Sequence, residues 1–225
     1  MQYQWILFDA DETLFHFDAF AGLQLMFSRY GVSFEQQDYQ HYQARNLPLW
    51  DAYQAGQVNA EQLQQQRFEY WANKLEQHPQ QLNDAFLVAM ADICSLLPGA
   101  KDLLDALKGK VKMGIITNGF TSLQNIRLER TGLTGYFSPL VISEQVGVAK
   151  PHKDIFEHAF EQMQYPEKHK VLMVGDNPHS DVQGGLNAGV HTCWLNRHGK
   201  DRPAGIEPHH EVSSLKQLQT LLEAA

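Results

Sequence analysis

The sequence predicts an α/β fold in which a parallel sheet flanked by helices carries one inserted helical segment. From residue 98 onward, short buried-strand patterns alternate with amphipathic helix patterns, an alternation typical of parallel sheets with right-handed crossovers. One further strand pattern stands near residue 5, before a stretch with only helical periodicity. We therefore predict a sheet-containing core formed by residues 1–15 and 98–225 and a helical domain formed by residues 16–97.

Composition narrows the possible partners and surroundings of the chain. Its 225 residues, 43% hydrophobic and 20% charged, suffice for one large globular domain with a smaller insert. The net charge of -8 argues against a nucleic-acid polymer as partner, although a few local cations would suffice for one phosphate. Two cysteines without a CxxC pair, no signal peptide and no apolar run of membrane-spanning length predict a cytoplasmic protein with no membrane partner.

The first strand is a run of four apolar residues, Trp5 to Phe8, followed by Asp9 and Asp11. In open α/β sheets, ligands bind beyond the carboxyl ends of the strands, so Asp9 stands where a substrate would arrive. A carboxylate there can attack phosphorus and form an aspartyl-phosphate, and a second carboxyl group can protonate the leaving oxygen. Two acids in an ordinary turn are the alternative interpretation.

Helical spacing of apolar residues predicts a four-helix insert. Gly31 is a suitable end for the first helix, and Pro48 is expected to break or kink the second. The apolar patterns cover residues 20–30, 39–42, 68–75 and 82–93.

The remaining chain predicts the alternating elements in order. Gly189 ends one helix, residues 196–210 form a long loop, and Ser214 opens the last helix through a capping box. Strands are expected at 111–117, 140–142, 171–174 and 191–195, and helices around 103–107, 122–132, 155–160, 181–188 and 215–222.

Two of these predicted strands and one predicted helix carry further chemical groups. Thr117, followed by Asn118 and a glycine, offers a hydroxyl at a strand end, where an ordinary turn is the alternative. Lys150 precedes a proline at an expected helix start, which would point its cation towards an anion site; a solvated surface lysine is the alternative.

Asp176 and Asp181 follow another strand end and form the second acid pair. Asp176 should reach the same cleft as Asp9, and two facing carboxylates repel each other unless a cation lies between them. Mg²⁺ prefers such oxygen ligands and is usually shared with substrate phosphate. Asp181 would act either as an ordinary first-turn acid or as a residue that orients a metal-bound water.

Taken together, these groups resemble the haloacid dehalogenase superfamily of phosphotransferases. The resemblance covers the whole chain, and the helical insert is similar to the C1 cap of that superfamily. Glu12 departs from the pattern, because glycine is commonest at this position. The four motifs are matched by Asp9–Leu14, Thr117–Gly119, Lys150–Pro151, and Gly175–Asp176 with Asp181.

The resemblance implies a Rossmann-like sheet and a Mg²⁺-dependent phosphomonoesterase, with the helical cap closing over the carboxyl ends of the strands. Asp9 would be the nucleophile and Asp11 the acid and base. The Asp9 carboxylate, the Asp11 main-chain carbonyl and Asp176 would hold Mg²⁺, which Mn²⁺ or Co²⁺ can replace. Asp181 would lie behind the metal ligands, while Thr117, Asn118 and Lys150 would bind the phosphate.

A closer resemblance, in the segments 8–15, 115–120 and 146–151, is to the bacterial YjjG-type pyrimidine 5'-nucleotidases, housekeeping enzymes that also remove noncanonical nucleotides. Between His16 and Leu97 the chain has nine Asp or Glu against four Lys or Arg, which favours a small-molecule monophosphate of a neutral group. Candidate residues for stacking on or contacting a base are Phe15, Phe17, Asn46 and Trp50. Three alternatives remain: a phosphosugar or phosphoglycolate phosphatase, a haloacid dehalogenase, and a non-catalytic binding module.

Overall fold

The computed structural model describes residues 2–224 and separates into two compact units. The sheet unit contains the chain up to His16, Ser95–Gly119 and the chain from Thr131 onward. The helical unit contains Phe17–Cys94 and Phe120–Arg130. Helix α7, Thr121–Arg130, therefore groups with the inserted helices. The domain boundaries predicted from the sequence place this helix in the core, and these boundaries stay a prediction.

The sheet unit contains a parallel sheet, which confirms the predicted α/β fold. Within residues 2–224 this sheet has six strands in the order β3-β2-β1-β4-β5-β6, and every neighbouring pair is parallel. This is the strand order of a Rossmann-type doubly wound sheet, in which the direction of winding reverses beside β1. The strands are β1 Trp5–Phe8, β2 Lys112–Thr117, β3 Leu140–Ile142, β4 Val171–Gly175, β5 His191–Leu195 and β6 His210–Val212.

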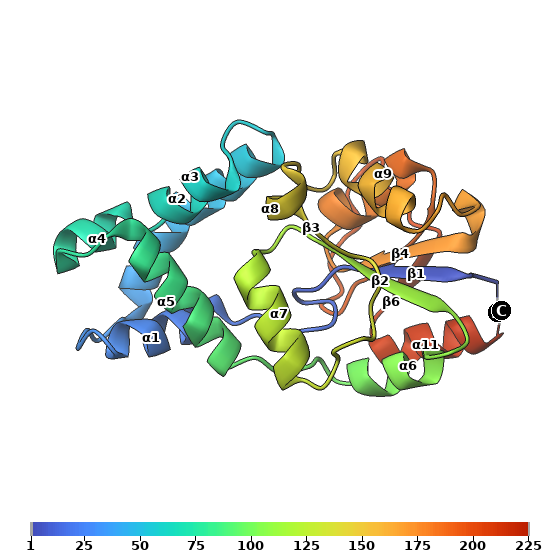
Figure 1. The fold of residues 1–225 in the computed structure, drawn as a ribbon, viewed down its shortest axis with the longest axis horizontal. Helices are drawn as coiled ribbons and strands as arrows, with labels where there is room; N and C mark the ends of the chain where they lie inside the picture. The colour runs from blue at the N-terminus through green and yellow to red at the C-terminus, as the bar shows by residue number, and fades with distance from the viewer. Residues whose placement is uncertain (1, 225) are drawn as a thin grey trace. The chain divides into compact units, whose positions relative to one another are not determined.

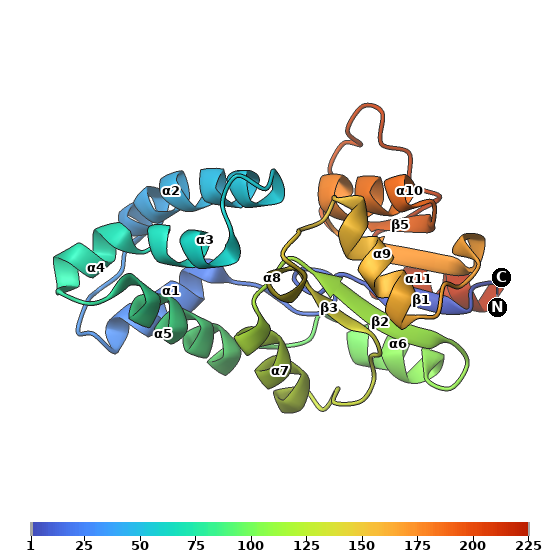
Figure 2. The ribbon, with the colours of Figure 1, turned by 45° about the horizontal axis from the view of Figure 1, so that its top comes forward.

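Helices cover both faces of this sheet (Figures 1 and 2). α9 and α10 lie together on one face, and α6 and α11 lie together on the other. No strand was predicted at the position of β6, whose first residue is the last residue of the expected loop. The strand was missed because three residues are too few to show the alternating pattern of a strand. The remaining elements of the unit are α6 Ala100–Leu107, α8 Ser143–Val146, α9 Lys153–Gln162, η1 Lys168–Lys170, η2 Pro178–Gln183, α10 Gly184–Ala188 and α11 Leu215–Ala224.

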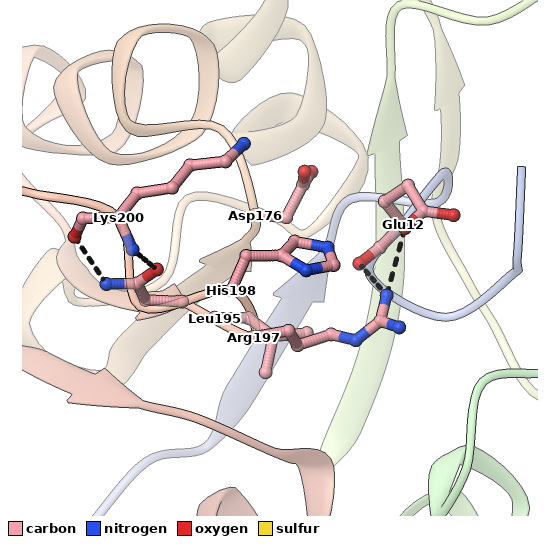
Figure 3. A pocket seen from close by; sticks show the side chains of 7 residues that line it. Glu12, Asp176, Leu195, Arg197, His198 and Lys200 are labelled. Atoms are coloured by element: carbon pink, nitrogen blue, oxygen red, sulfur yellow. Dashed lines mark hydrogen bonds and ion pairs between the residues drawn. The ribbon is translucent and has the colours of Figure 1, made fainter.

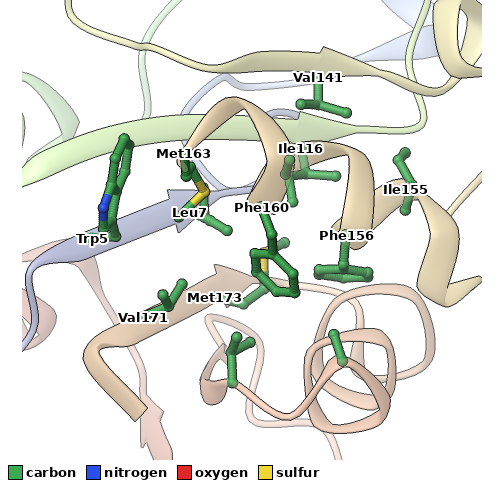
Figure 4. Close-up of a cluster of buried hydrophobic side chains, with 13 residues drawn as sticks. Trp5, Leu7, Ile116, Val141, Ile155, Phe156, Phe160, Met163, Val171 and Met173 are labelled. Atoms are coloured by element: carbon green, nitrogen blue, oxygen red, sulfur yellow. The ribbon is translucent and has the colours of Figure 1, made fainter. Parts of the chain in front are cut away.

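One hydrophobic core fills the space between the sheet and α9 (Figure 4). Trp5 and Leu7 point to this face, because successive side chains of a strand alternate between its two sides. Phe156 and Phe160, four residues apart on α9, belong to the same cluster and are fully buried. Each buried aromatic ring of this kind contributes about 1.5–3 kcal/mol of transfer free energy, so this packing stabilises the position of β1.

The helical unit contains more helices than the sequence predicted. Residues 17–94, all of them described, form five helices rather than four, and α5 contacts α1, α3, α4 and α7. The missed helix is α3, whose glutamine-rich sequence has little apolar periodicity, although Asn59 and Gln62 form a capping box at its start. The helices of this unit are α1 Ala19–Ser28, α2 Gln36–Gln54, α3 Ala60–Gln66, α4 Glu69–Leu75, α5 Pro79–Asp92 and α7 Thr121–Arg130.

Pro48 was predicted to break or kink the second helix, and the break is wrong because the helix does not end there. α2 runs through Pro48 as one helix of 19 residues. A proline inside a helix removes one backbone hydrogen bond, but tertiary packing supplies most helical stability. Tyr42 and Tyr53, on the two sides of Pro48, are both buried, and this packing holds the helix together.

Within residues 2–224, no helix has the length and apolar character needed to cross a membrane.

Candidate active site

Asp9 lies at the carboxyl end of β1, where the strand order reverses. Its main-chain N–H donates to the carbonyl of Val174 at 2.8 Å, which extends the pairing of β1 with β4 by one step. Its carboxylate meets Lys150, whose Nζ lies 2.6 Å from Oδ1, and accepts a long hydrogen bond of 3.4 Å from the hydroxyl of Thr13. The side chain is 12% exposed, so Asp9 is held by protein groups and still reaches solvent.

Lys150 is the buried cation of this site. It is 1% exposed, and its Nζ also lies 2.7 Å from Oδ1 of Asp181. Burial alone would lower the pKa of Lys150, but the charges and hydrogen bonds of Asp181 and Asp9 raise it overall. The ammonium group is therefore charged at neutral pH, and the surface-lysine alternative does not apply.

The position of Lys150 has a different cause from the one predicted. α9 begins at Lys153 with His152 as its N-cap, so Lys150 lies in the preceding turn and not at a helix start. The side-chain amide of Asn118 holds this turn instead. Asn118 Nδ2 donates to the carbonyl of Lys150 at 2.9 Å, and Asn118 Oδ1 accepts from its N–H at 2.7 Å. Both polar atoms of the Asn118 amide are thereby engaged with the main chain of Lys150.

Three aspartates converge beside Lys150. One carboxylate oxygen from each of Asp9, Asp176 and Asp181 lies within 4.8 Å of the others. Burial, followed by the charges of Asp181 and Asp9, raises the pKa of Asp176 to about 8. Burial also raises the pKa of Asp181, to about 6, although Lys150 opposes this shift. One ammonium group therefore does not balance three carboxylates, and oxygen ligands so close together fit a divalent cation.

Asp181 is held on both of its carboxylate oxygens. Oδ1 contacts Lys150 and accepts from the hydroxyl of Ser180 at 3.1 Å, while Oδ2 accepts from the N–H of Asn177 at 3.0 Å. Its carboxylate packs so closely on Gly175 that an added Cβ would lie 2.1 Å from Oδ2. Glycine is therefore required at the end of β4. Asp181 lies in the π-helical turn η2, a local structure that is frequent at functional sites.

Thr13 joins the two strand ends and was not among the predicted site residues. It is fully buried, and its Oγ1 accepts a hydrogen bond of 3.1 Å from the N–H of Asp176 while contacting Asp9. The only sequence feature that could have identified Thr13 as a site residue is its position within the motif Asp9–Leu14. No local pattern shows that its hydroxyl reaches a residue 163 positions away.

Glu12 has a left-handed backbone conformation, with φ of +55°. For a residue with a side chain this conformation costs about 1–2 kcal/mol, and glycine adopts it without that cost. The carboxylate of Glu12 is held from two sides, because Oε2 accepts from Nη1 of Arg197 at 3.0 Å and Oε1 lies 3.2 Å from Nδ1 of His16. Glu12 departs from the motif in the sequence, but no sequence pattern predicts its partner Arg197.

The other predicted site residues differ in their surroundings. Asp11 is partly exposed beside Glu12. Thr117 is buried at the end of β2, and its Oγ1 accepts from the N–H of Gly119 at 3.0 Å. Phe15 is fully buried in the sheet unit, which contradicts its prediction as a residue that could stack on a base.

The remaining three candidates belong to the helical unit. Asn46 accepts a hydrogen bond of 3.4 Å from the hydroxyl of Tyr42. The Trp50 ring packs on Phe120, with centroids 5.4 Å apart. Phe17 is partly exposed at the start of the unit.

The doubly wound sheet with an acidic cluster and a buried lysine at its strand ends defines a class of hydrolase. The model of the haloacid dehalogenase-like hydrolases matches residues 3–189, and the chain belongs to this family. It is 58% identical over 222 residues to the pyrimidine 5'-nucleotidase YjjG of Escherichia coli, with 99% of each chain covered.

Two further comparisons agree with this family. The pyrimidine 5'-nucleotidase PynA of Streptococcus pneumoniae is 34% identical over 232 residues, covering 99% of this chain and 96% of the relative. The crystal structure of the HAD-hydrolase YfnB of Bacillus subtilis, bound to magnesium, superposes with a TM-score of 0.85 at 28% identity and 98% coverage of both chains.

Proposed function

We propose that the protein is a Mg²⁺-dependent phosphomonoesterase that acts through an aspartyl-phosphate on residue 9. The observation that carries this proposal is the placement of Asp9 against Lys150, with Asp176 and Asp181 within 4.8 Å, at the switch point of the sheet. A nucleophilic carboxylate, a cation for the phosphoryl oxygens and ligands for a metal are the parts that such a reaction needs.

The reaction takes place in two displacements. A carboxylate oxygen of Asp9 forms a bond to phosphorus while the bond from phosphorus to the ester oxygen breaks, and Asp11 gives its proton to that departing oxygen. Asp11 then takes a proton from a water molecule, whose oxygen bonds to phosphorus and displaces Asp9. The products are an alcohol and inorganic phosphate, and both aspartates return to their initial protonation states.

The surrounding residues supply charge and position. The carboxylates of Asp9 and Asp176, with the main-chain carbonyl of Asp11, would hold Mg²⁺, which when bound neutralises phosphate charge. Asp181 would lie behind the metal ligands and orient a water molecule bound to the metal. Lys150 and the hydroxyl of Thr117, with the main chain of Asn118, would bind the equatorial phosphoryl oxygens.

The substrate that fits best is a pyrimidine nucleoside 5'-monophosphate. Two relatives that align over nearly the whole chain are named for this activity. The excess of acidic residues between His16 and Leu97 disfavours substrates with a second phosphate or a carboxylate. We assign base selection to the helical unit, with Phe17, Asn46 and Trp50 as candidates. A phosphosugar or phosphoglycolate phosphatase is the alternative, whereas a haloacid dehalogenase would need neither a second acid nor a metal.

A substrate panel ranked by kcat/KM tests the proposal. Uridine and thymidine 5'-monophosphates are expected to exceed phosphosugars and phosphoglycolate, with 2-chloropropionate and Mg²⁺-free samples as controls. A lead of tenfold or more for a phosphosugar or phosphoglycolate, about 1.4 kcal/mol of transition-state preference, would refute the nucleotidase assignment and leave the phosphatase core. Turnover of the chloroacid without phosphatase activity would refute both.

A further inference from the structure

Arg197 lies two residues after the end of β5, on a turn whose backbone is fixed by the side chain of its neighbour Asn196. The side chain of Asn196 donates to the carbonyl of Lys200 at 2.9 Å and accepts from its N–H at 2.8 Å. Asn196 also pairs with β6, because its N–H donates to the carbonyl of Val212 at 2.8 Å. These bonds close the turn at residues 196–200 and give Arg197 a rigid base.

This turn lines a small pocket together with Glu12 and Asp176 (Figure 3). Across the pocket, Nη1 of Arg197 donates to Oε2 of Glu12 at 3.0 Å and lies 3.5 Å from the main-chain carbonyl of Glu12. Arg197 is 25% exposed, so this ion pair is partly shielded from solvent. The guanidinium group thus reaches both the side chain and the backbone of the one residue in residues 9–14 that has a positive φ.

Glu12 stands between two residues on which the chemistry depends. Asp11 precedes it, and Thr13, whose hydroxyl joins the strand ends at Asp9 and Asp176, follows it. A change in the backbone of Glu12 therefore moves both neighbours. The N–H of Glu12 donates to the carbonyl of Phe15 at 2.7 Å, which holds the strained turn locally. Arg197 adds a second restraint from a segment 185 residues away.

We propose that Arg197 and Glu12 form a clamp that positions Asp11 for proton transfer to the leaving group. Arg197 is a positioning residue, because it acts through Glu12 and its guanidinium group contacts that residue. This inference rests on the proposed function, in which Asp11 is the acid.

Leaving-group dependence tests the clamp. Proton donation matters for an alkoxide such as the 5'-oxygen of a nucleoside, and it matters little for p-nitrophenolate, which leaves readily as an anion. For R197M we expect kcat/KM to fall about tenfold with uridine 5'-monophosphate and less than threefold with p-nitrophenyl phosphate. D11N should show the same pattern more strongly. A fold made generally less stable would lower both values by the same factor.

R202M is the matched control. Arg202 lies on the same connection between β5 and β6, but it pairs with Glu207 and Glu211 at 2.6 and 2.9 Å. Its replacement should leave both substrates within twofold of the parent. R197K, which keeps the charge but not the planar fork, should recover part of the loss with the nucleotide.

A double-mutant cycle with E12G tests the coupling directly. Glycine adopts the left-handed conformation unaided, so R197M should cost less than threefold on the nucleotide in the E12G background. Equal losses on both substrates, or the same tenfold loss in the E12G background, would overturn the clamp. If D11N itself shows no leaving-group dependence, the proposed role of Asp11 fails first, and the two failures are thereby distinguished.

Discussion

Replacing Lys150 with methionine should destabilise the protein strongly, and the size of the effect follows from the geometry. The ammonium group is buried and lies 2.6 and 2.7 Å from Asp9 and Asp181. At an effective dielectric constant of about 20, each contact provides about 6 kcal/mol of gross attraction, most of which offsets the desolvation of the charges. Removal of one partner of a buried ion pair leaves uncompensated charge and typically costs about 3–5 kcal/mol.

We therefore expect K150M to lower the free energy of unfolding by about 3–5 kcal/mol in EDTA. For a chain of this size the same loss corresponds to a fall in Tm of about 6–20 °C. Urea titration and calorimetry would measure both, with K153M as the matched control, because Lys153 is exposed three residues further on. Added Mg²⁺ should restore part of the loss, since a cation between the carboxylates replaces some of the missing charge.

A fall of less than 1 kcal/mol in EDTA, or an equal fall in K153M, would refute the reasoning. The first result would mean that the carboxylates of Asp9 and Asp181 do not depend on Lys150 for their burial. The second would mean that the turn at residues 150–153 tolerates no substitution, whatever its charge.

Three other predictions follow from the same structure. D9N should fold with an unchanged circular dichroism spectrum but lose phosphatase activity, because an amide is a poor nucleophile; turnover near that of the parent would exclude the covalent route. EDTA should abolish activity and Mg²⁺ should restore it, with Mn²⁺ or Co²⁺ as substitutes; full activity in excess EDTA would reopen the dehalogenase alternative. Burial lowers the pKa of His191 and His210, which contact the hydroxyl of Tyr3 at 3.0 and 2.8 Å. Stability from these histidines is complete above their unfolded pKa of about 6.5 and is lost as pH falls below it, so H191N should flatten the pH dependence of unfolding between pH 5 and 7.

The sequence predicted that the strand-end acids share one edge of the sheet, because parallel strands bring their carboxyl ends to the same edge. In the structure β1 and β4 are neighbours, so the acids that follow them lie close together. Asp9 and Asp176 were found in this way. No information on side-chain contacts was needed for this prediction, because each of the two residues directly follows a run of buried apolar positions.

Contacts made across long separations in the chain could not be predicted in the same way. Lys150 is placed by the amide of Asn118, 32 residues earlier, and not by a helix start. Glu12 is held by Arg197, which lies in a stretch expected to be a plain loop. Neither contact leaves a periodic pattern in the sequence, because both depend on where two turns meet in the folded sheet unit.

Asp181 has a feature of an ordinary first-turn acid and a second feature that such an acid lacks. It accepts from the N–H of Asn177, the N-cap residue of its own turn η2, as a first-turn acid does. Unlike an exposed first-turn acid, it is buried and also accepts from Lys150 and from the hydroxyl of Ser180. With both oxygens engaged by protein groups, its charge acts mainly on Lys150, which it keeps protonated and directed at Asp9. The lysine then places its positive charge beside the carboxylate that we propose as the nucleophile, where charge on an incoming phosphate would also need to be neutralised.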